Sequence, residues 1–311
     1  MTIDTGKVDL VLQGGGVKGI ALVGAVNQLR ESSYPHVERI AGTSAGAVVA
    51  GFVAAGMSSH RLEQVMKELD YSQFQQSKLW SRYSLIGKGF ELVKYGGLYR
   101  TDYLRQWIKE NLASCNVHTW SDLAYADSRL PVNQRYKLVV VVSDISRGRM
   151  LRLPWDYESY LDLDPNVQLV ADAITASASI PFFFQPQHLV CGPLMNREKL
   201  TLTDGGILSN FPVDLFDLTP QWPTIGVRLS ARQCLTEQWR PTNRPSRILR
   251  RLFDTMMGAR DSIYTDQKSV QDRTIFIDIT DISGVSFSLD DKQRDDLYQK
   301  GRVAAQKFLS T

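Results

Sequence analysis

Apolar residues follow two different spacings along this chain. Short continuous apolar runs, each typical of a buried strand, begin at Val8, Val37, Leu138, Leu200 and Ile225. Longer segments between them carry apolar residues every three or four positions, most clearly at Ile20, Leu22, Val23, Val26 and Leu29. Strands that alternate with helices predict an α/β fold, a three-layer sandwich whose parallel-rich central sheet is flanked by helices.

The second apolar run ends in Gly-Thr-Ser-Ala-Gly, residues 42–46, and an apolar helical segment follows directly. A serine on a glycine-flanked turn between strand and helix has the pattern of a nucleophile elbow. Glycine is needed on both sides because the serine backbone is strained there and a neighbouring chain passes close to it. The pattern makes Ser44 a candidate nucleophile.

A second glycine cluster, Gly-Gly-Gly-Val-Lys-Gly at residues 14–19, lies between the first strand and the first helix. Consecutive glycines at a helix N-terminus leave backbone N–H groups able to stabilise an oxyanion or a phosphate. The same residues match GxGxxG, so a dinucleotide-binding, Rossmann-like module is the alternative. That fingerprint requires an acid at the end of the second strand, whereas Glu38 lies inside the strand pattern and the strand ends at Gly42.

A third cluster, Asp204-Gly205-Gly206, follows the run that begins at Leu200. The two glycines allow another backbone to approach the carboxylate, as a base for a serine hydroxyl requires. No histidine follows Asp204, so a hydrolase triad in the order Ser, Asp, His is excluded if Asp204 is its acid. Triads in other orders exist, and His188 stays open as an alternative base.

Together the three clusters resemble those of the patatin-like phospholipase family in order and spacing. Residues 143–149 and 176–182 also look like intermediate blocks of that family. The resemblance covers residues 8–218, a patatin-like acyl hydrolase domain with a lid or insertion at residues 70–103. Residues 219–311 carry no recognisable motif, and we expect them to complete the same domain with further strands and helices.

The resemblance implies a serine acyl hydrolase that uses Ser44 as nucleophile and Asp204 as general base and forms an acyl-enzyme. It also implies an oxyanion hole made by the backbone amides of Gly14, Gly15 and Gly16, and no metal or organic cofactor. The other motif residues that support the resemblance are Lys18, Gly19, Gly42, Ala45, Gly46, Gly205 and Gly206.

The substrates implied by the resemblance are glycerophospholipids or related acyl lipids at a membrane surface. Members of the family serve lipid turnover, act as delivered toxins, or are defence enzymes switched on by a small-molecule signal or a partner. A catalytically latent protein that requires such an activator is therefore a further interpretation. The sequence does not choose among these roles.

Composition and charge argue against several other classes of protein. The chain has 311 residues, 43% of them hydrophobic, and its net charge of +3 with dispersed basic residues gives no indication of nucleic-acid binding. Cys115, Cys191 and Cys234 lack the spacing of a disulfide framework or a zinc site. No signal sequence opens the chain, and its longest apolar run, residues 45–57, is too short to span a bilayer. We therefore expect a cytoplasmic protein, peripheral to the membrane when active, with signal-less export left open.

Three regions bear on which substrate the protein binds, and the sequence allows two interpretations of each. Residues 71–103 mix aromatic and basic side chains, which suits either a membrane-contacting lid or the packing of an insertion. Residues 245–257 form a basic amphipathic pattern that favours a core-facing helix over a lipid-facing one. Three phenylalanines, residues 182–184, predict an acyl-pocket wall or plain core. Asp144 also follows an apolar strand, but without adjacent glycines it is predicted to be a turn or capping residue.

Overall fold

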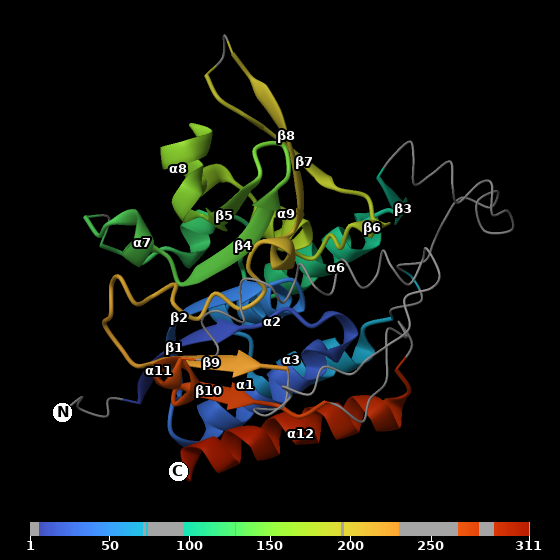
Figure 1. Ribbon diagram of the computed structural model, residues 1–311, viewed down its shortest axis with the longest axis vertical. Coiled ribbons are helices and arrows are strands. Elements are labelled where there is room, and N and C mark those ends of the chain that lie inside the picture. Colours follow the sequence, from blue (N-terminus) through green and yellow to red (C-terminus); the bar gives the residue numbers. More distant parts are fainter. Residues whose placement is uncertain are drawn as a thin grey trace, which may run out of the picture.

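The computed structural model describes residues 6–70, 73, 96–127, 129–193, 196–229, 267–279 and 289–310. Among them, an eight-stranded sheet forms the centre of the molecule (Figure 1). Its strands are β1 (Lys7–Leu12), β2 (His36–Thr43), β4 (Leu138–Asp144), β5 (Arg149–Leu153), β7 (Gln187–Cys191), β8 (Glu198–Asp204), β9 (Thr224–Arg228) and β10 (Thr274–Phe276). A separate two-stranded sheet is made by β3 (Gly97–Tyr99) and β6 (Phe182–Phe184).

Helices flank the central sheet. The α-helices of the described residues are α1 (Gly19–Ser32), α2 (Ala45–Ala54), α3 (Ser59–Glu68), α6 (Asp102–Ala113), α7 (Val132–Arg135), α8 (Trp155–Leu161), α9 (Val170–Ser177), α11 (Lys268–Gln271) and α12 (Asp291–Leu309). Short 3₁₀ turns are η1 (Gly16–Lys18), η3 (Trp120–Leu123), η4 (Pro165–Val167) and η5 (Gly205–Ile207). Of these helices, none is both long and apolar enough to cross a membrane.

The strand order is β10-β9-β1-β2-β4-β8-β7, and the first five of these strands run parallel. β8 and β7 continue the sheet in antiparallel fashion, and β5 pairs with β4 outside this path. All five apolar runs are strands, and the predicted α/β fold with a parallel-rich sheet is confirmed. β1 and β4 are buried on both faces, which explains why their sequences are continuously apolar rather than alternating.

Strand β4 holds the ends of two other strands together. One side of β4 pairs with β5 over its last five residues. The other side is shared by β2 and β8, which meet end to end: Thr43 of β2 pairs with Val141, and Asp204 of β8 pairs with Val142. Two strands that lie far apart in the sequence therefore end at consecutive positions of a third.

The two faces of the sheet are covered unequally. On one face, α1, α2, α3, α6, α9 and α12 build the larger core with the inward residues of the strands. On the other, Val11, Ala41 and Val139 pack against a smaller group of side chains from α8, α11 and the chain after η5. Members of that smaller group are Trp155, Phe211, Val213, Phe216 and Val270.

A buried ion pair lies on this second face. Asp9 of β1 and Arg39 of β2 are at most 1% exposed, and the guanidinium donates hydrogen bonds to both carboxylate oxygens. Arg39 also donates to the side chain and the carbonyl of Thr219, at 3.0 and 2.9 Å, and stacks over Phe216. The ion pair therefore connects the chain after η5 to the N-terminal halves of β1 and β2.

Several sequence predictions fall on residues outside the described part of the chain. They are most of the segment proposed as lid or insertion (residues 71–72 and 74–95), the basic amphipathic segment at residues 245–257, and Cys234. The described end of the proposed lid forms β3 and the start of α6, whose N-cap is Thr101.

The longest of the described helices, α12, packs along α1 through two glycines (Figure 1). A Cβ on Gly301 would lie 2.0 Å from the carbonyl oxygen of Ala21, and a Cβ on Gly24 would lie 2.0 Å from that of Tyr298. The two helices approach so closely because neither backbone carries a side chain at the contact.

We expect Gly301→Ala to lower the free energy of unfolding by about 1–2 kcal/mol, measured by urea denaturation. Overpacking costs about 1–3 kcal/mol, and a clash with a backbone oxygen belongs in the upper part of this range, at about 2–3 kcal/mol; the higher helix propensity of alanine offsets about 1 kcal/mol of it. Val303→Ala is the control, since Val303 lies on the same helix and is 47% exposed, and it should change stability by at most about 0.5 kcal/mol. Equal effects of the two substitutions would contradict the close helix contact.

Candidate active site

Ser44 occupies a strained turn between β2 and α2. Its backbone has φ 53° and ψ −124°, a combination that non-glycine residues rarely adopt, and it is the N-cap residue of α2. A Cβ on Gly42 would lie 2.3 Å from the carbonyl oxygen of Gly46, and a Cβ on Gly46 would lie 2.5 Å from that of Gln13. Both glycines are therefore required by close backbone approach, as the elbow pattern predicts.

The backbone N–H of Ser44 is held by a side chain. It donates to the hydroxyl of Ser177, at the end of α9, over 2.9 Å. That hydroxyl in turn donates to the carbonyl of Val141 in β4, over 2.6 Å. The backbone of Ser44 is thus connected to the strand that also pairs with the end of β8.

Asp204 lies at the end of β8 and is completely buried. Its Oδ1 accepts the N–H of Gly206 at 2.8 Å, and its own N–H donates to the carbonyl of Ser179 at 3.0 Å. Burial raises the pKa of Asp204 to about 7, while the neighbouring Ser44 hydroxyl and the Gly206 N–H lower it. Oδ2 has no partner with full hydrogen-bond geometry among the described residues, so the Ser44 hydroxyl is close to the carboxylate but not fully engaged.

The structure corrects one part of the expected oxyanion hole. The N–H of Gly14 donates to the carbonyl of Asn210 at 3.0 Å and is therefore engaged in the fold. A Cβ on Gly14 would lie 2.2 Å from Oδ1 of Asn210 and 3.1 Å from Cβ of Ser44, so the residue is needed for its small size. Within the part of the chain that the structure describes, the N–H groups of Gly15 and Gly16 have no acceptor.

The remaining motif glycines bring elements into contact. A Cβ on Gly19 would lie 3.0 Å from Cβ of Ala45, and a Cβ on Gly205 would lie 2.2 Å from the carbonyl oxygen of Val141. Gly16 has φ 54°, which favours glycine. Lys18 ends the η1 turn and is the N-cap residue of α1.

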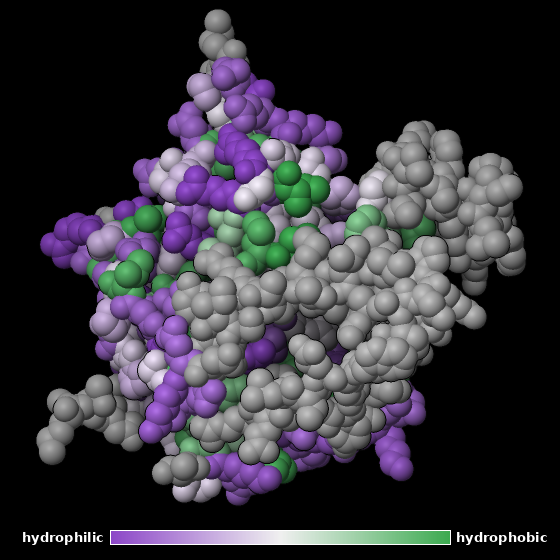
Figure 2. Space-filling model, in the orientation of Figure 1, coloured by the Kyte–Doolittle hydropathy of each residue, from purple (hydrophilic) through white to green (hydrophobic). Residues whose placement is uncertain are grey.

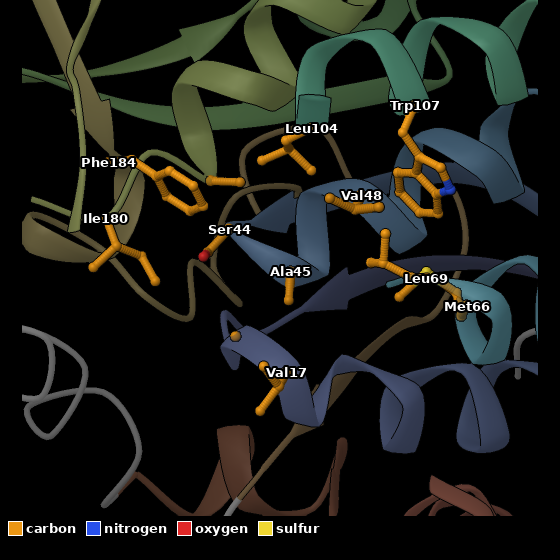
Figure 3. Close-up of a pocket in the computed structure, with 12 residues that line it drawn as sticks. Val17, Ser44, Ala45, Val48, Met66, Leu69, Leu104, Trp107, Ile180 and Phe184 are labelled. Atoms are coloured by element: carbon orange, nitrogen blue, oxygen red, sulfur yellow. The ribbon is translucent and has the colours of Figure 1, made fainter. Parts of the chain in front are cut away.

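An apolar pocket opens beside Ser44, and its empty space amounts to about 500 Å³ when the open solvent at its mouth is counted (Figure 3). Ser44 is the single hydroxyl-bearing residue among its described lining, and no charged side chain lines it. The lining residues are Gly16, Val17, Ser44, Ala45, Val48, Met66, Leu69, Leu104, Trp107, Ala178, Ile180 and Phe184. In Figure 3, Ile180 and Phe184 lie beside Ser44, and Val48 lies between Ser44 and the far group of Trp107, Leu69 and Met66. A hydrocarbon chain is the kind of ligand such a wall accepts.

The three phenylalanines of the sequence pattern have different environments. Phe184 is buried in the larger core and also lines the pocket, so it belongs to both environments that the sequence left open. Phe182 is 44% exposed and has φ 66°. On the face in Figure 2, apolar side chains gather in the upper middle, where β7 and β8 lie in Figure 1.

The alternative site residues are not brought to Ser44. His188 is an exposed residue of β7, which β8 separates from β4. Glu38 lies near the start of β2, where it pairs with Lys7, rather than at the strand end that a ribose-binding acid requires. Asp144 accepts the N–H of Ser146 at 2.9 Å, as expected of a turn residue. Across the described residues, no three His, Cys, Asp or Glu side chains are grouped as a metal ion would require.

Sequence reasoning assigned no role to Asn210 or Ser177. Asn210 connects the chain after Asp204 to the glycine loop by a backbone hydrogen bond to Gly14, and Ser177 connects α9 to Ser44. Both contacts join residues more than 130 positions apart. No periodicity or motif spacing marks such pairs.

Several known proteins are similar to this chain. The family model described as Patatin-like phospholipase matches residues 10–217. The uncharacterized protein YqhO of Bacillus subtilis (strain 168) is 33% identical over 97% of this chain and 98% of its own length. The uncharacterized protein R571 of Acanthamoeba polyphaga mimivirus is 26% identical over 94% of this chain and 90% of its own.

Among solved structures, the crystal structure of VipD from Legionella pneumophila resembles this one with a TM-score of 0.52. The alignment covers 98% of this chain and 66% of VipD, at 16% sequence identity. The chain therefore spans about two thirds of the length of VipD, and the likeness shows a shared fold.

We expect replacement of the buried Asp204 to change how stability depends on pH. The Asp204 carboxyl binds its proton more tightly in the folded protein, with a pKa of about 7, than in the unfolded chain. Its contribution to stability is therefore present below about pH 4 and is lost as the pH rises through 7. Relative to wild type, Asp204→Asn should gain on the order of 4 kcal/mol in free energy of unfolding between pH 4 and pH 8.

Urea denaturation of both proteins at a series of pH values measures this difference. The curves for Asp204→Asn and wild type should lie closest together at pH 4 and separate toward pH 8. Parallel curves over the whole range would show that the folded-state pKa of Asp204 is not raised.

Proposed function

Because the chain belongs to the patatin-like phospholipase family, we propose that it is a lipid acyl hydrolase of phospholipase A type. In this proposal it cleaves ester bonds of glycerophospholipids or related acyl lipids with Ser44 as nucleophile and Asp204 as general base. The observation that carries the proposal is the position of Ser44, on a strained turn at an apolar pocket and beside a buried carboxylate.

In the first half of the proposed reaction, Oγ of Ser44 attacks the ester carbonyl and its proton passes to the Asp204 carboxylate. The carbonyl oxygen becomes an oxyanion, and the N–H groups of Gly15 and Gly16 are the candidate donors to it. The N-terminus of α2, whose N-cap residue is Ser44, adds partial positive charge beside the serine. The proton on Asp204 then goes to the leaving alcohol as the ester bond breaks.

In the second half, water attacks the acyl-enzyme. Asp204 takes a proton from the water, the acyl–oxygen bond to Ser44 breaks, and the proton returns to Oγ of Ser44. The products are a fatty acid and the free serine, so the dyad ends as it began. A carboxyl with a pKa of about 7 suits both directions, because it binds and releases a proton near neutral pH.

The pocket supports an acyl lipid rather than a polar ester as substrate. Its described walls are apolar from Phe184 beside Ser44 to Trp107 and Met66 at the far end (Figure 3). We therefore place the acyl chain along Val48 and the headgroup outside the pocket mouth. Such a substrate would be met at a membrane surface, where the protein would act as a peripheral enzyme.

The central test is labelling with a fluorophosphonate, whose fluoride Oγ of Ser44 displaces. We expect wild type to be labelled at Ser44, Ser44→Ala to be unlabelled, and Asp204→Asn to be labelled at least 100-fold more slowly, at the lower end of what loss of a general base costs. The wild-type rate should rise with pH to a plateau, with an apparent pKa near 7, because only ionised Asp204 accepts the proton. Mass spectrometry of the adduct locates the label.

His188→Ala is the matched control, since it removes an alternative base that is exposed on β7, and it should leave the labelling rate unchanged. A lower labelling rate in His188→Ala, together with an unchanged rate in Asp204→Asn, would identify His188 as the base instead of Asp204. Failure of wild type to label, with and without lipid vesicles, together with binding of a nicotinamide dinucleotide, would support the dinucleotide-binding alternative instead.

The pocket also predicts a chain-length effect. Val48→Phe fills the space between Ser44 and the far end, so we expect kcat/KM for a decanoyl ester to fall by roughly 10- to 100-fold. Each methylene that no longer enters the pocket loses about 0.8 kcal/mol of burial. The butyryl ester should change by less than about threefold, because its chain ends before the obstruction.

Hydrolysis of a series of p-nitrophenyl esters measures this dependence. Val48→Ala is the control, because it makes the side chain smaller and should leave kcat/KM for the long-chain esters close to that of wild type. An equal loss for butyryl and decanoyl esters in Val48→Phe would mean that the acyl chain does not lie along Val48.

A further inference from the structure

Ser177 is a fully buried residue whose hydroxyl forms hydrogen bonds with the turn that carries Ser44 and with β4. A serine hydroxyl has one proton to donate and lone pairs to accept. Here the proton is donated to the carbonyl of Val141 at 2.6 Å, and the oxygen accepts the N–H of Ser44 at 2.9 Å. The hydroxyl is therefore a bridge between the nucleophile's backbone and β4.

This bridge lies where strand pairing ends. Thr43 still pairs with Val141, but Ser44 turns away from the sheet into α2. The N–H of Ser44 is consequently buried at a position where the pairing of β2 and β4 provides no acceptor for it. Without Ser177, that N–H and the strained backbone at φ 53° would lose a partner, and a buried donor without a partner is costly.

The same short segment also holds the base. The carbonyl of Ser179, two residues after Ser177, accepts the N–H of Asp204 at 3.0 Å and the hydroxyl of Thr203 at 2.7 Å. The end of α9 therefore contacts the nucleophile through the Ser177 side chain and the base through the Ser179 backbone. A shift of the Ser44 backbone relative to this segment would move Oγ relative to Asp204.

We propose that Ser177 is a positioning residue for the hydrolysis: its hydroxyl fixes the strained backbone of Ser44 so that Oγ stays directed at Asp204. The inference rests on the proposed function. Ser177 is not itself one of the described residues that line the pocket, so its loss should affect the chemical step and leave binding nearly unchanged.

The experiment compares Ser177→Ala with Thr175→Val. Thr175 is also fully buried in α9, but its hydroxyl donates to the carbonyl of Ala171 within the same helix, so this control removes a buried hydroxyl without touching Ser44. Ser177→Cys, whose thiol is a weak hydrogen-bonding group, replaces the alanine variant if that variant does not fold.

The first measurement is fluorophosphonate labelling, with the saturating rate kinact separated from the inhibition constant KI. We expect Ser177→Ala to lower kinact by about 10- to 100-fold, as misplacement of a reacting group does, with KI within about twofold of wild type. Thr175→Val should leave kinact within about twofold. Melting temperatures of both variants show whether a loss of stability alone explains the rates.

The second measurement observes the hydrogen bond directly. Thr43-Ser44 is the only Thr-Ser pair in the sequence, so labelling with carbonyl-¹³C threonine and ¹⁵N serine gives one amide signal in a carbonyl-correlated NMR spectrum. In Ser177→Ala we expect the Ser44 amide proton to move upfield and to exchange faster with solvent. In Thr175→Val both properties should stay as in wild type.

A normal wild-type reaction with an unchanged kinact in Ser177→Ala would overturn the inference alone. So would an unmoved Ser44 amide signal, or equal losses of kinact in Ser177→Ala and Thr175→Val. Absence of labelling in wild type would overturn the proposed hydrolase activity, and the positioning role with it.

Discussion

The candidate site depends on the way β2 and β8 meet end to end along one side of β4. β5 occupies the other side of β4, so both strands must share the remaining one. β2 ends opposite Val141 directly before Ser44, and β8 ends opposite Val142 on Asp204, so both residues of the proposed dyad lie at this junction. The separation of Ser44 and Asp204 is thus set by backbone hydrogen bonds of the sheet, which are among the stiffest parts of a domain, rather than by loop conformation.

A comparison with another buried carboxylate, that of Asp9, shows what is special about Asp204. Burial raises the pKa of Asp9 as well, but Asp9 is opposed by the guanidinium of Arg39, which donates to both of its oxygens. Asp204 has one backbone N–H and the nearby hydroxyl of Ser44 instead of a cation. The first arrangement compensates a buried charge and serves the fold, whereas the second leaves the carboxyl able to change its protonation near neutral pH.

Much of this site could be predicted from the sequence because its motifs are local. The strand runs, the elbow around Ser44 and the acid at the end of β8 are encoded by consecutive residues, and glycines mark the close approaches. The Gly14 amide was assigned wrongly because its acceptor, Asn210, is 196 residues away and no pattern reports it. The hydrogen bonds of the Ser177 hydroxyl and the set of residues that line the pocket could not be predicted for the same reason, because both depend on packing between elements far apart in the sequence. His188 is near Asp204 in the sequence, yet it lies on β7, one strand further from β4.

Burial of Asp204 has two opposite effects on its use as a base. At a pKa of 3.8 nearly all of the carboxyl would be ionised at pH 7, but it would be a weak base toward a serine hydroxyl. At a pKa of about 7 roughly half is ionised, which costs only about a factor of two in active enzyme, while the ionised form is a far stronger base. An acyl chain that fills the apolar pocket would exclude water and raise the pKa further, which strengthens the ionised form as a base and lowers the fraction that is ionised. Among the described residues, no cation lies beside Asp204 to lower its pKa again, and this suits the carboxyl to its proposed role as a base.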